Sequence, residues 1–184
     1  GIKGAVVSFG LFRKDLKNFF LQVRAPATLA QLESFGLNDD YLDYDIITKR
    51  NGGEASISGV ELEYRQTLHF LPGWARGAQV FGNLTSMRLG GANADDFSGY
   101  TSKTGNWGLS FTRPRFGARV AVNYTGLRRM ATAAASASVR PGSYNYYAPQ
   151  TRIDVSASYM INRRVSAYFD IRNLTGVPLR RGTW

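Results

Sequence analysis

The sequence predicts an all-β protein, an antiparallel up-and-down meander of about seven strands that forms part of a transmembrane β-barrel. Apolar and polar residues alternate in runs that are mostly longer than the roughly five to six residues of soluble strands. Long and short connections between these runs follow each other in strict alternation. An Asn-x-Thr pattern recurs at 83–85, 123–125 and 173–175, each time at the end of such a run. Long loop, strand, short turn, strand is the rhythm of an outer-membrane barrel.

The individual strands are recognised by their two-residue period. In the clearest run, Ile153, Val155 and Ala157 alternate with polar neighbours, and a tight turn at 162–163 leads to the next run. In the first segment the parity blurs beyond Leu11, so the pattern does not fix its register. The predicted runs are 3–23, 60–70, 77–87, 107–112, 117–125, 152–160 and 164–172.

The connections give the meander a direction. Those at 24–44, 88–104 and 127–149 are long, and they alternate with three short turns. Soluble sandwiches and lipocalin-like barrels rarely separate loop lengths so consistently. Outer-membrane barrels do, with short turns on the periplasmic side and long loops on the extracellular side. The three Asn-x-Thr triplets are therefore expected near the outer rim, on strands that run toward the cell exterior.

Each predicted strand has one apolar, aromatic face and one polar face. In a soluble sandwich the apolar face would pack on a second sheet. In a membrane barrel it meets lipid, and the charged side chains line a wet lumen. The strand and loop lengths favour the barrel. The residues expected to face the lumen are Glu61, Glu63, Arg65, Arg119, Asp154 and Asp170.

The composition argues against several other classes of protein. The 184 residues include no cysteine, which excludes disulfide frameworks and thiolate metal sites, and the single His69 disfavours a histidine-based metal site. The net charge is +10, but the arginine pairs are dispersed at strand ends, so no nucleic-acid partner is expected. Glu61 and Glu63 could form a carboxylate pair for acid–base chemistry, yet a polar lumen row is the better interpretation. We therefore expect no enzyme, no cofactor and no metal.

Several motifs, in order along the chain, resemble the C-terminal barrel of TonB-dependent outer-membrane receptors. The most specific is the Asn-Gly-Gly-Glu-Ala stretch at 51–55, which leads from a loop into the Gly-Val-Glu-Leu-Glu strand at 59–63. Residues 12–19 resemble a strand of that family, and 70–73 resemble a periplasmic turn. Residues 170–176 resemble the Asn-Leu-Thr signature of its penultimate strand. Together these motifs span nearly the whole sequence.

The resemblance implies a barrel of about 22 strands whose lumen is plugged by an N-terminal globular domain. It also implies location in the bacterial outer membrane and active uptake of a scarce ligand too large for porins. Typical ligands of the family are ferric siderophores, cobalamin or oligosaccharides. The expected partners are the outer-membrane lipid bilayer, the receptor's own plug domain, the protein TonB and the transported ligand.

The departures from the family pattern concern the organisation of the chain. We expect residues 1–184 to be a single region, the C-terminal part of such a barrel, without the plug domain, the TonB-box segment or the last strand. Pro178, Arg180, Arg181 and Gly182 are not expected to form a strand. An odd number of strands would also not close an even-stranded bacterial barrel.

The loop at 127–149 holds the candidate ligand contacts, because guanidinium groups and aromatic rings suit anionic siderophores or sugar rings. An ordinary tyrosine-rich interface belt is the alternative interpretation. Two other functions stay open at this point: a different outer-membrane porin or channel, and a soluble basic β-domain that binds polysaccharide or nucleic acid. The candidate ligand residues are Arg128, Arg140, Tyr144, Tyr146 and Tyr147.

Overall fold

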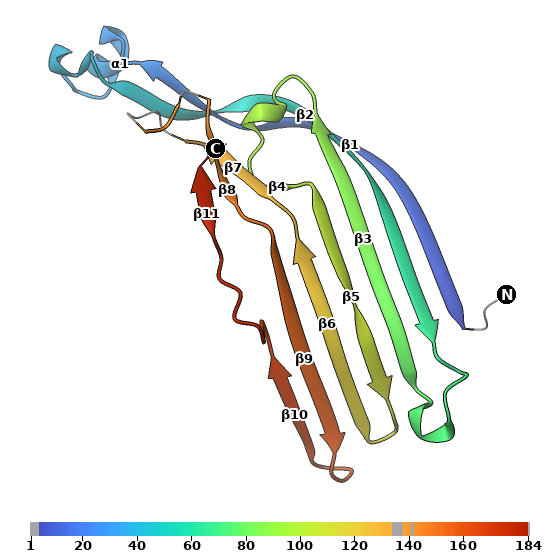
Figure 1. Ribbon diagram of the computed structural model, residues 1–184. Coiled ribbons are helices and arrows are strands. Elements are labelled where there is room, and N and C mark those ends of the chain that lie inside the picture. The colour runs from blue at the N-terminus through green and yellow to red at the C-terminus, as the bar shows by residue number, and fades with distance from the viewer. Residues whose placement is uncertain (1–3, 134–137, 141, 184) are drawn as a thin grey trace.

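The computed structural model describes residues 4–133, 138–140 and 142–183 and confirms the predicted antiparallel meander. Seven strands form one curved sheet in the order β1-β2-β3-β5-β6-β9-β10, and four short strands form a second sheet in the order β11-β8-β7-β4 (Figure 1). The main sheet does not close on itself, so β1 and β10 are its edge strands. Its strands are β1 (Ala5–Pro26), β2 (Asp45–Thr67), β3 (Ala78–Gly90), β5 (Lys103–Thr112), β6 (Phe116–Thr125), β9 (Gln150–Met160) and β10 (Ser166–Ile171). The second sheet consists of β4 (Tyr100–Thr101), β7 (Arg128–Thr132), β8 (Tyr144–Tyr147) and β11 (Arg181–Thr183).

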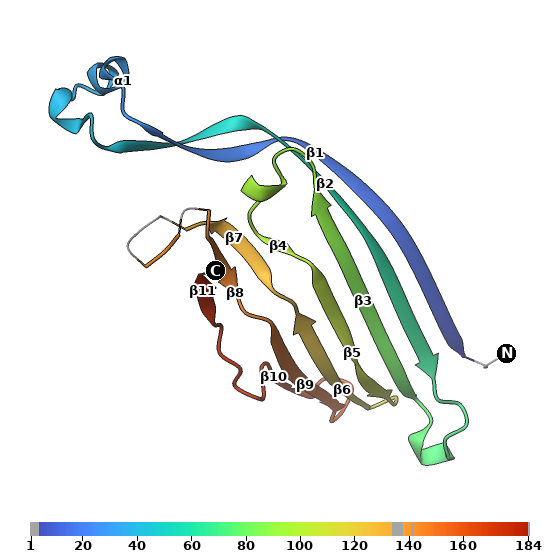
Figure 2. The ribbon, with the colours of Figure 1, turned by 45° about the horizontal axis from the view of Figure 1, so that its top comes forward.

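The first two strands are much longer than the others. β1 has 22 residues and β2 has 23, whereas about 9–11 tilted residues suffice to cross a bilayer. Their far end therefore projects beyond the rest of the sheet, as both ribbon views show (Figures 1 and 2). The projecting tip contains α1 (Leu29–Ser34) and η1 (Asp39–Tyr41). The side chains of Thr28 and Gln31 form a capping box at the start of α1.

The sequence pattern of the first segment loses its parity for two reasons: charged residues follow apolar ones on the same face, and a bulge then shifts the register. Asn18 has a left-handed backbone (φ 57), and the pairing with β2 shifts between Lys17 and Phe19. Before the bulge, Arg13 and Asp15 form a 3.1 Å ion pair. They lie on the same face of β1 as the apolar side chains near its start. Alternation thus persists in this part of β1, but the apolar side chains no longer mark one face.

The connections fall at two opposite ends of the main sheet, as predicted. The short-turn end contains residues 68–77, 113–115 and 161–165, and the first of these is widened by η2 (Gly73–Ala75). The long-loop end contains residues 27–44, 91–102 and 126–149. Two of these loops contain further secondary structure: 91–102 contains η3 (Ala94–Asp96) and β4, and 126–149 contains β7 and β8, which pair with each other.

The Asn-x-Thr triplets differ in their positions from the prediction. Only 123–125 closes a strand, because β3 continues past residues 83–85 to Gly90, and 173–175 follows the end of β10. Asn83 and Asn123 instead lie at one level of the sheet, each opposite Asn106 of β5. The strands that carry or precede the triplets do run in one direction, since exactly one antiparallel neighbour separates β3 from β6 and β6 from β10.

The expectation that Pro178, Arg180, Arg181 and Gly182 form no strand is wrong for the last two of these residues. Arg181–Thr183 form β11, which pairs antiparallel with β8 in the second sheet. The irregular segment 172–180 brings it there. β11 is therefore an addition to the loop structure and does not extend the main sheet.

The main sheet is a single layer without a conventional core. Among the described residues, only seven hydrophobic side chains are buried, five of them alanines, and no large side chain is fully buried. The second sheet lies at the long-loop end of the main sheet (Figure 1). Large apolar groups on one main-sheet face stay open, such as Val120 (43% exposed) and Phe169 (54% exposed). None of the described helices has the length and apolar character needed to cross a bilayer.

Candidate functional site on the polar face and the long loops

The strand register places all six charged candidates on one face of the main sheet, here called the polar face. Directly opposed residues of paired strands point to the same side of a sheet. Glu63 opposes Asn83, which opposes Asn106, and so on across β5 and β6 to Arg152 of β9. Arg119 opposes Ser156, which opposes Asp170. The register of the paired strands thus places all of these residues on the polar face: Glu61, Glu63, Arg65, Arg119, Asp154 and Asp170.

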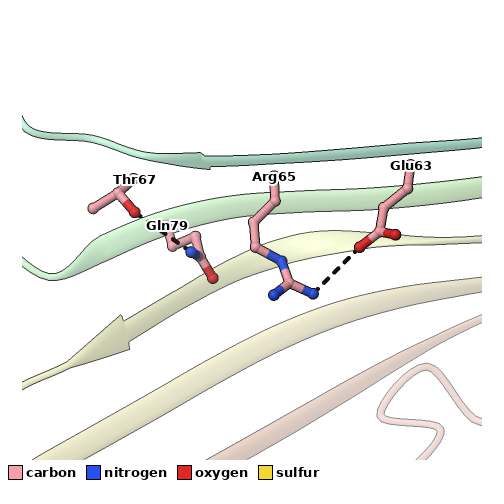
Figure 3. A network of polar contacts seen from close by, with 4 residues as sticks. All are labelled: Glu63, Arg65, Thr67 and Gln79. Carbon is pink, nitrogen blue, oxygen red and sulfur yellow. Dashed lines mark hydrogen bonds and ion pairs between the residues drawn. The ribbon is translucent and has the colours of Figure 1, made fainter. Parts of the chain in front are cut away.

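The polar groups of this face are largely paired with one another. The Glu63 carboxylate lies 3.3 Å from Arg65, and the Gln79 amide donates to Thr67 on the neighbouring strand (Figure 3). The guanidinium of Arg119 lies 3.8 Å from the centroid of the Phe81 ring. No group of three or more potential metal ligands occurs among the described residues. The face is thus a polar wall whose side chains mostly contact one another.

An amide and carboxylate row crosses the middle of the polar face. Asn106 donates to the side-chain oxygen of Asn123, whose own amide donates to Asp154 at 2.7 Å. The second carboxylate oxygen of Asp154 accepts the backbone N–H of Asn173 at 2.8 Å. Beside this row is a shallow hollow of about 310 Å³ that Arg119, Asp154 and Asp170 help to line. The Asn-x-Thr asparagines therefore contribute to this wall.

The opposite face, here called the apolar face, carries exposed hydrophobic side chains from every strand of the main sheet. Its members oppose one another in register: Leu62 opposes Leu84, and Leu109 opposes Val120. The most exposed members include Val7, Phe9, Leu62, Leu84, Trp107, Leu109, Val120 and Phe169. The two faces thus separate apolar from charged side chains in every strand, up to the level at which Arg13 and Asp15 of β1 interrupt the apolar face.

At the long-loop end, the second sheet divides the predicted ligand residues between its two faces. Arg128 opposes Tyr147, and Arg129 opposes Tyr146. Because neighbouring residues of a strand point to opposite sides, Tyr144 and Tyr146 lie with Arg129, whereas Arg128 and Tyr147 lie on the other side. The five candidates therefore do not converge on one point.

Arg129 joins two of the long loops on the first of these faces. Its side chain is only 18% exposed, and its guanidinium lies 3.1 Å from Asp95 and donates to the carbonyl of Ala94. The same guanidinium stacks 4.7 Å from the centroid of the Tyr144 ring. Burial, and to a smaller extent the Asp95 carboxylate, raises the pKa of Tyr144, and burial also raises the pKa of Tyr100. We call Asp95, Tyr100, Arg129 and Tyr144 the Arg129 cluster.

A cavity of about 470 Å³ adjoins this cluster, lined in part by Met87, Tyr100, Arg129 and Tyr146. The Nε atom of Arg129 is buried and has no hydrogen-bond partner among the described residues. Sequence reasoning did not select Arg129. Between Arg129 and Thr132 the pairing of β7 with β8 shifts its register, which no residue pattern in the sequence predicts.

On the second face, two arginines flank one tyrosine. The guanidinium carbons of Arg128 and Arg181 lie 6.0 Å and 5.3 Å from the centroid of the Tyr147 ring. Both arginines are exposed, and neither forms an ion pair within the described part of the chain. The sequence did not predict Arg181 as a site residue, because no strand was expected at its position. Arg140 lies apart and exposed, with its carbonyl accepting from Ser143 at 3.2 Å.

Comparison with known families decides the identity of this fold. The family described as "TonB dependent receptor-like, beta-barrel" matches residues 2–174. The chain belongs to this family. No curated protein and no solved structure matched the sequence. This is a family of outer-membrane receptors and transporters of TonB-dependent transport rather than of enzymes.

Proposed function

We propose that this chain forms part of the barrel wall of a receptor for active, TonB-driven uptake of a scarce ligand too large for porins. The proposed ligand is a ferric siderophore, cobalamin or an oligosaccharide. The observation that carries the proposal is the separation of the sheet into one apolar and one polar face. A wall with lipid on one side and a wet lumen on the other needs this separation along every strand.

In this arrangement the apolar face meets the outer-membrane lipids, and the polar face lines the lumen. The paired charges, such as Glu63 with Arg65, then face the receptor's plug domain. The amide row around Asn123 and Asp154 offers both donors and acceptors to such a neighbour. TonB would act from the periplasmic side through the plug.

Ligand contact is proposed for the long-loop end. The exposed guanidiniums of Arg128 and Arg181 beside Tyr147 suit an anionic ligand, since guanidinium groups bind carboxylates and similar oxyanions through paired hydrogen bonds. Tyr144 and Tyr146 add aromatic surface on the cavity side. Arg140 is kept as a peripheral contact.

The orientation of the faces can be tested by placing a charge on each of them. Val120→Arg or Phe169→Arg in the intact receptor should prevent or strongly weaken insertion, by about 2–4 kcal/mol for a position near the bilayer midplane. Ser156→Arg should be tolerated, because its new guanidinium would lie opposite Asp170 on the polar face. Heat-modifiable gel mobility measures the folded fraction. Equal tolerance on both faces would show that the assignment is wrong.

The ligand surface needs a separate test. The double variant Arg128→Gln with Arg181→Gln should lower uptake of an anionic ligand by about tenfold or more, because two charge-assisted contacts are removed. Arg50→Gln, on the projecting hairpin, is the matched control and should leave uptake unchanged. The dose dependence of uptake into intact cells measures the effect. An unaffected double variant would remove this surface from the proposed ligand site.

A further inference from the structure

The three turns of the short-turn end form one continuous edge, here called the short-turn rim (residues 68–77, 113–115 and 161–165). The Arg113 guanidinium donates to the carbonyl of Gly73 and so connects the first turn to the second. The backbone N–H of Met160 donates to the carbonyl of Arg115 at 2.8 Å and connects the second turn to the end of β9. The side chains of these turns therefore act as parts of one surface.

The rim is uniformly basic. Its turns contain five arginines and no aspartate or glutamate. Four of these arginines are exposed and the fifth, Arg113, is half-buried; within the described residues none of the five forms an ion pair. By contrast, the three long connections at the other end contain six acidic and three basic residues. The rim arginines are Arg76, Arg113, Arg115, Arg163 and Arg164.

Aromatic side chains lie immediately beside these charges. Trp74 and Phe70 in the first turn are 80% and 75% exposed. Phe111 and Phe116 pack with ring centroids 6.0 Å apart at the end of the apolar face, and Tyr159 opposes Phe116 in register. The Arg113 guanidinium lies 5.7 Å from the Phe111 centroid, so this arginine reaches the apolar face itself.

An aromatic belt marks the level at which a membrane protein passes from hydrocarbon to headgroups. Guanidinium groups just beyond that belt stand at the level of lipid phosphates, which they bind through paired hydrogen bonds. We propose that the short-turn rim is a binding surface for anionic phospholipid headgroups of the surrounding leaflet. The inference rests on the proposed function, because it requires the apolar face to meet lipid.

The test uses the intact receptor in phosphatidylcholine vesicles that contain a trace of spin-labelled phosphatidylglycerol or spin-labelled phosphatidylcholine. The fraction of motionally restricted label gives the relative association of each headgroup with the protein. We expect a preference for phosphatidylglycerol that falls in high salt. In the triple variant Arg115→Gln, Arg163→Gln, Arg164→Gln the preference should fall at least about fivefold.

The matched control removes three exposed positive charges from the other end, through Lys49→Gln, Arg50→Gln and Lys103→Gln. It should keep the preference, and the corresponding three arginine-to-lysine changes in the rim should keep most of it. The proposal is overturned if the wild-type receptor shows no headgroup preference, or if rim and control variants lose it equally.

Heat-modifiable mobility of each variant separates this inference from the proposed function. A receptor that inserts but does not select phosphatidylglycerol contradicts only the lipid surface. A wild-type receptor that does not insert contradicts the membrane function itself. If the triple variant fails to fold, the salt and headgroup dependence of the wild-type receptor still decides the question.

Discussion

At the short-turn end of the main sheet, chain reversals are closed mainly by hydrogen bonds within each turn, with Arg113 as a side-chain link between two turns, whereas at the long-loop end side chains from separate loops hold each other. In the 161–165 turn, the N–H groups of Arg164 and Val165 donate to the side chain of Asn162 at 2.8 and 2.9 Å. At the other end, Arg129 of β7 binds Asp95 and Ala94 of a different loop.

The difference indicates how each end is coupled to the barrel. A tight turn fixes the register of the two strands that it joins, so damage there is expected to spread through the sheet. The Arg129 cluster joins loops whose strands are already paired below it, so damage there should stay local. Four predictions test this contrast.

The largest effect is expected at Gly77, which follows η2 at the short-turn end. It has φ +103, and an added Cβ would lie 2.2 Å from the Thr112 carbonyl oxygen of the adjacent strand. Gly77→Ala should lower the free energy of unfolding of the intact receptor by about 3 kcal/mol or more, through strain and displaced backbone. Gly73→Ala in the same turn is the control, since nothing lies within 4 Å of its Cβ position. Denaturant unfolding measures both, and similar stabilities would contradict the prediction.

Removing the Arg129 guanidinium should weaken the long-loop end without melting the sheet. Arg129→Gln loses the ion pair with Asp95 and most of the stacking on Tyr144, about 1–3 kcal/mol of local stability. Amide hydrogen exchange should quicken in residues 91–102 while β5 and β6 stay protected. Arg128→Gln is the neighbouring control, because Arg128 is exposed and its side chain reaches the 91–102 loop only through a 3.3 Å hydrogen bond to Thr101, without an ion pair in the described structure. Faster exchange throughout the sheet would show that the two ends are equally coupled.

Two side chains whose hydrogen bonds contribute similar free energies, Asn162 and Thr28, allow a direct comparison of the short-turn and long-loop ends. Asn162→Ala removes two acceptor contacts in a short turn, and Thr28→Ala removes the N-cap of α1 in the projecting tip. Each change should cost about 1 kcal/mol. The loss at Asn162 should appear in global unfolding, whereas the loss at Thr28 should appear only in proteolysis of the tip. The contrast fails if both variants shift the global transition alike.

The smallest effect concerns pH. Burial raises the pKa of Tyr144 and Tyr100 above the ordinary value of 10.0. A raised folded-state pKa means that the neutral form supports the Arg129 cluster. This contribution is complete below pH 10 and is lost as the pH rises through the raised pKa. The tyrosinate absorbance of wild type minus Tyr144→Phe should therefore titrate above the ordinary tyrosine range. A difference titration at the ordinary value would contradict the burial of Tyr144.

The sequence predicts a strand and its apolar face correctly where apolar residues recur every second position along one apolar environment, as in Ile153, Val155 and Ala157. The pattern failed in β1, because the strand extends past the apolar region and contains the Asn18 bulge. It placed Asn83 at a strand end, although β3 continues for seven further residues to Gly90. The alternation of apolar residues does not predict how far a strand continues beyond the part that faces lipid.

The composition of the loop identified the tyrosines and Arg128 as candidate site residues. It did not show which of them lie together, and it did not identify Arg129 or Arg181. Arg129 and Arg128 are neighbours in sequence, and only strand pairing shows that they point to opposite sides. Arg181 reaches Tyr147 through β11, which pairs across an irregular segment. Such long-range pairings depend on the fold of the loops and leave no local signal.

The β1–β2 hairpin sets the outline of the molecule in the orientation proposed. The pairing of β2 with β3 ends at Ser56, and Asn93 of the next loop still holds Glu54 through two hydrogen bonds. Beyond that point, residues 45–53 pair with β1 alone among the described strands, a two-stranded arm of about 30 Å. Its far end carries Gly36, whose Cβ position is open to solvent. A molecule approaching from outside the cell would contact this arm before it reached the other long loops, and an epitope inserted at Gly36 would be displayed well above the mouth of the barrel.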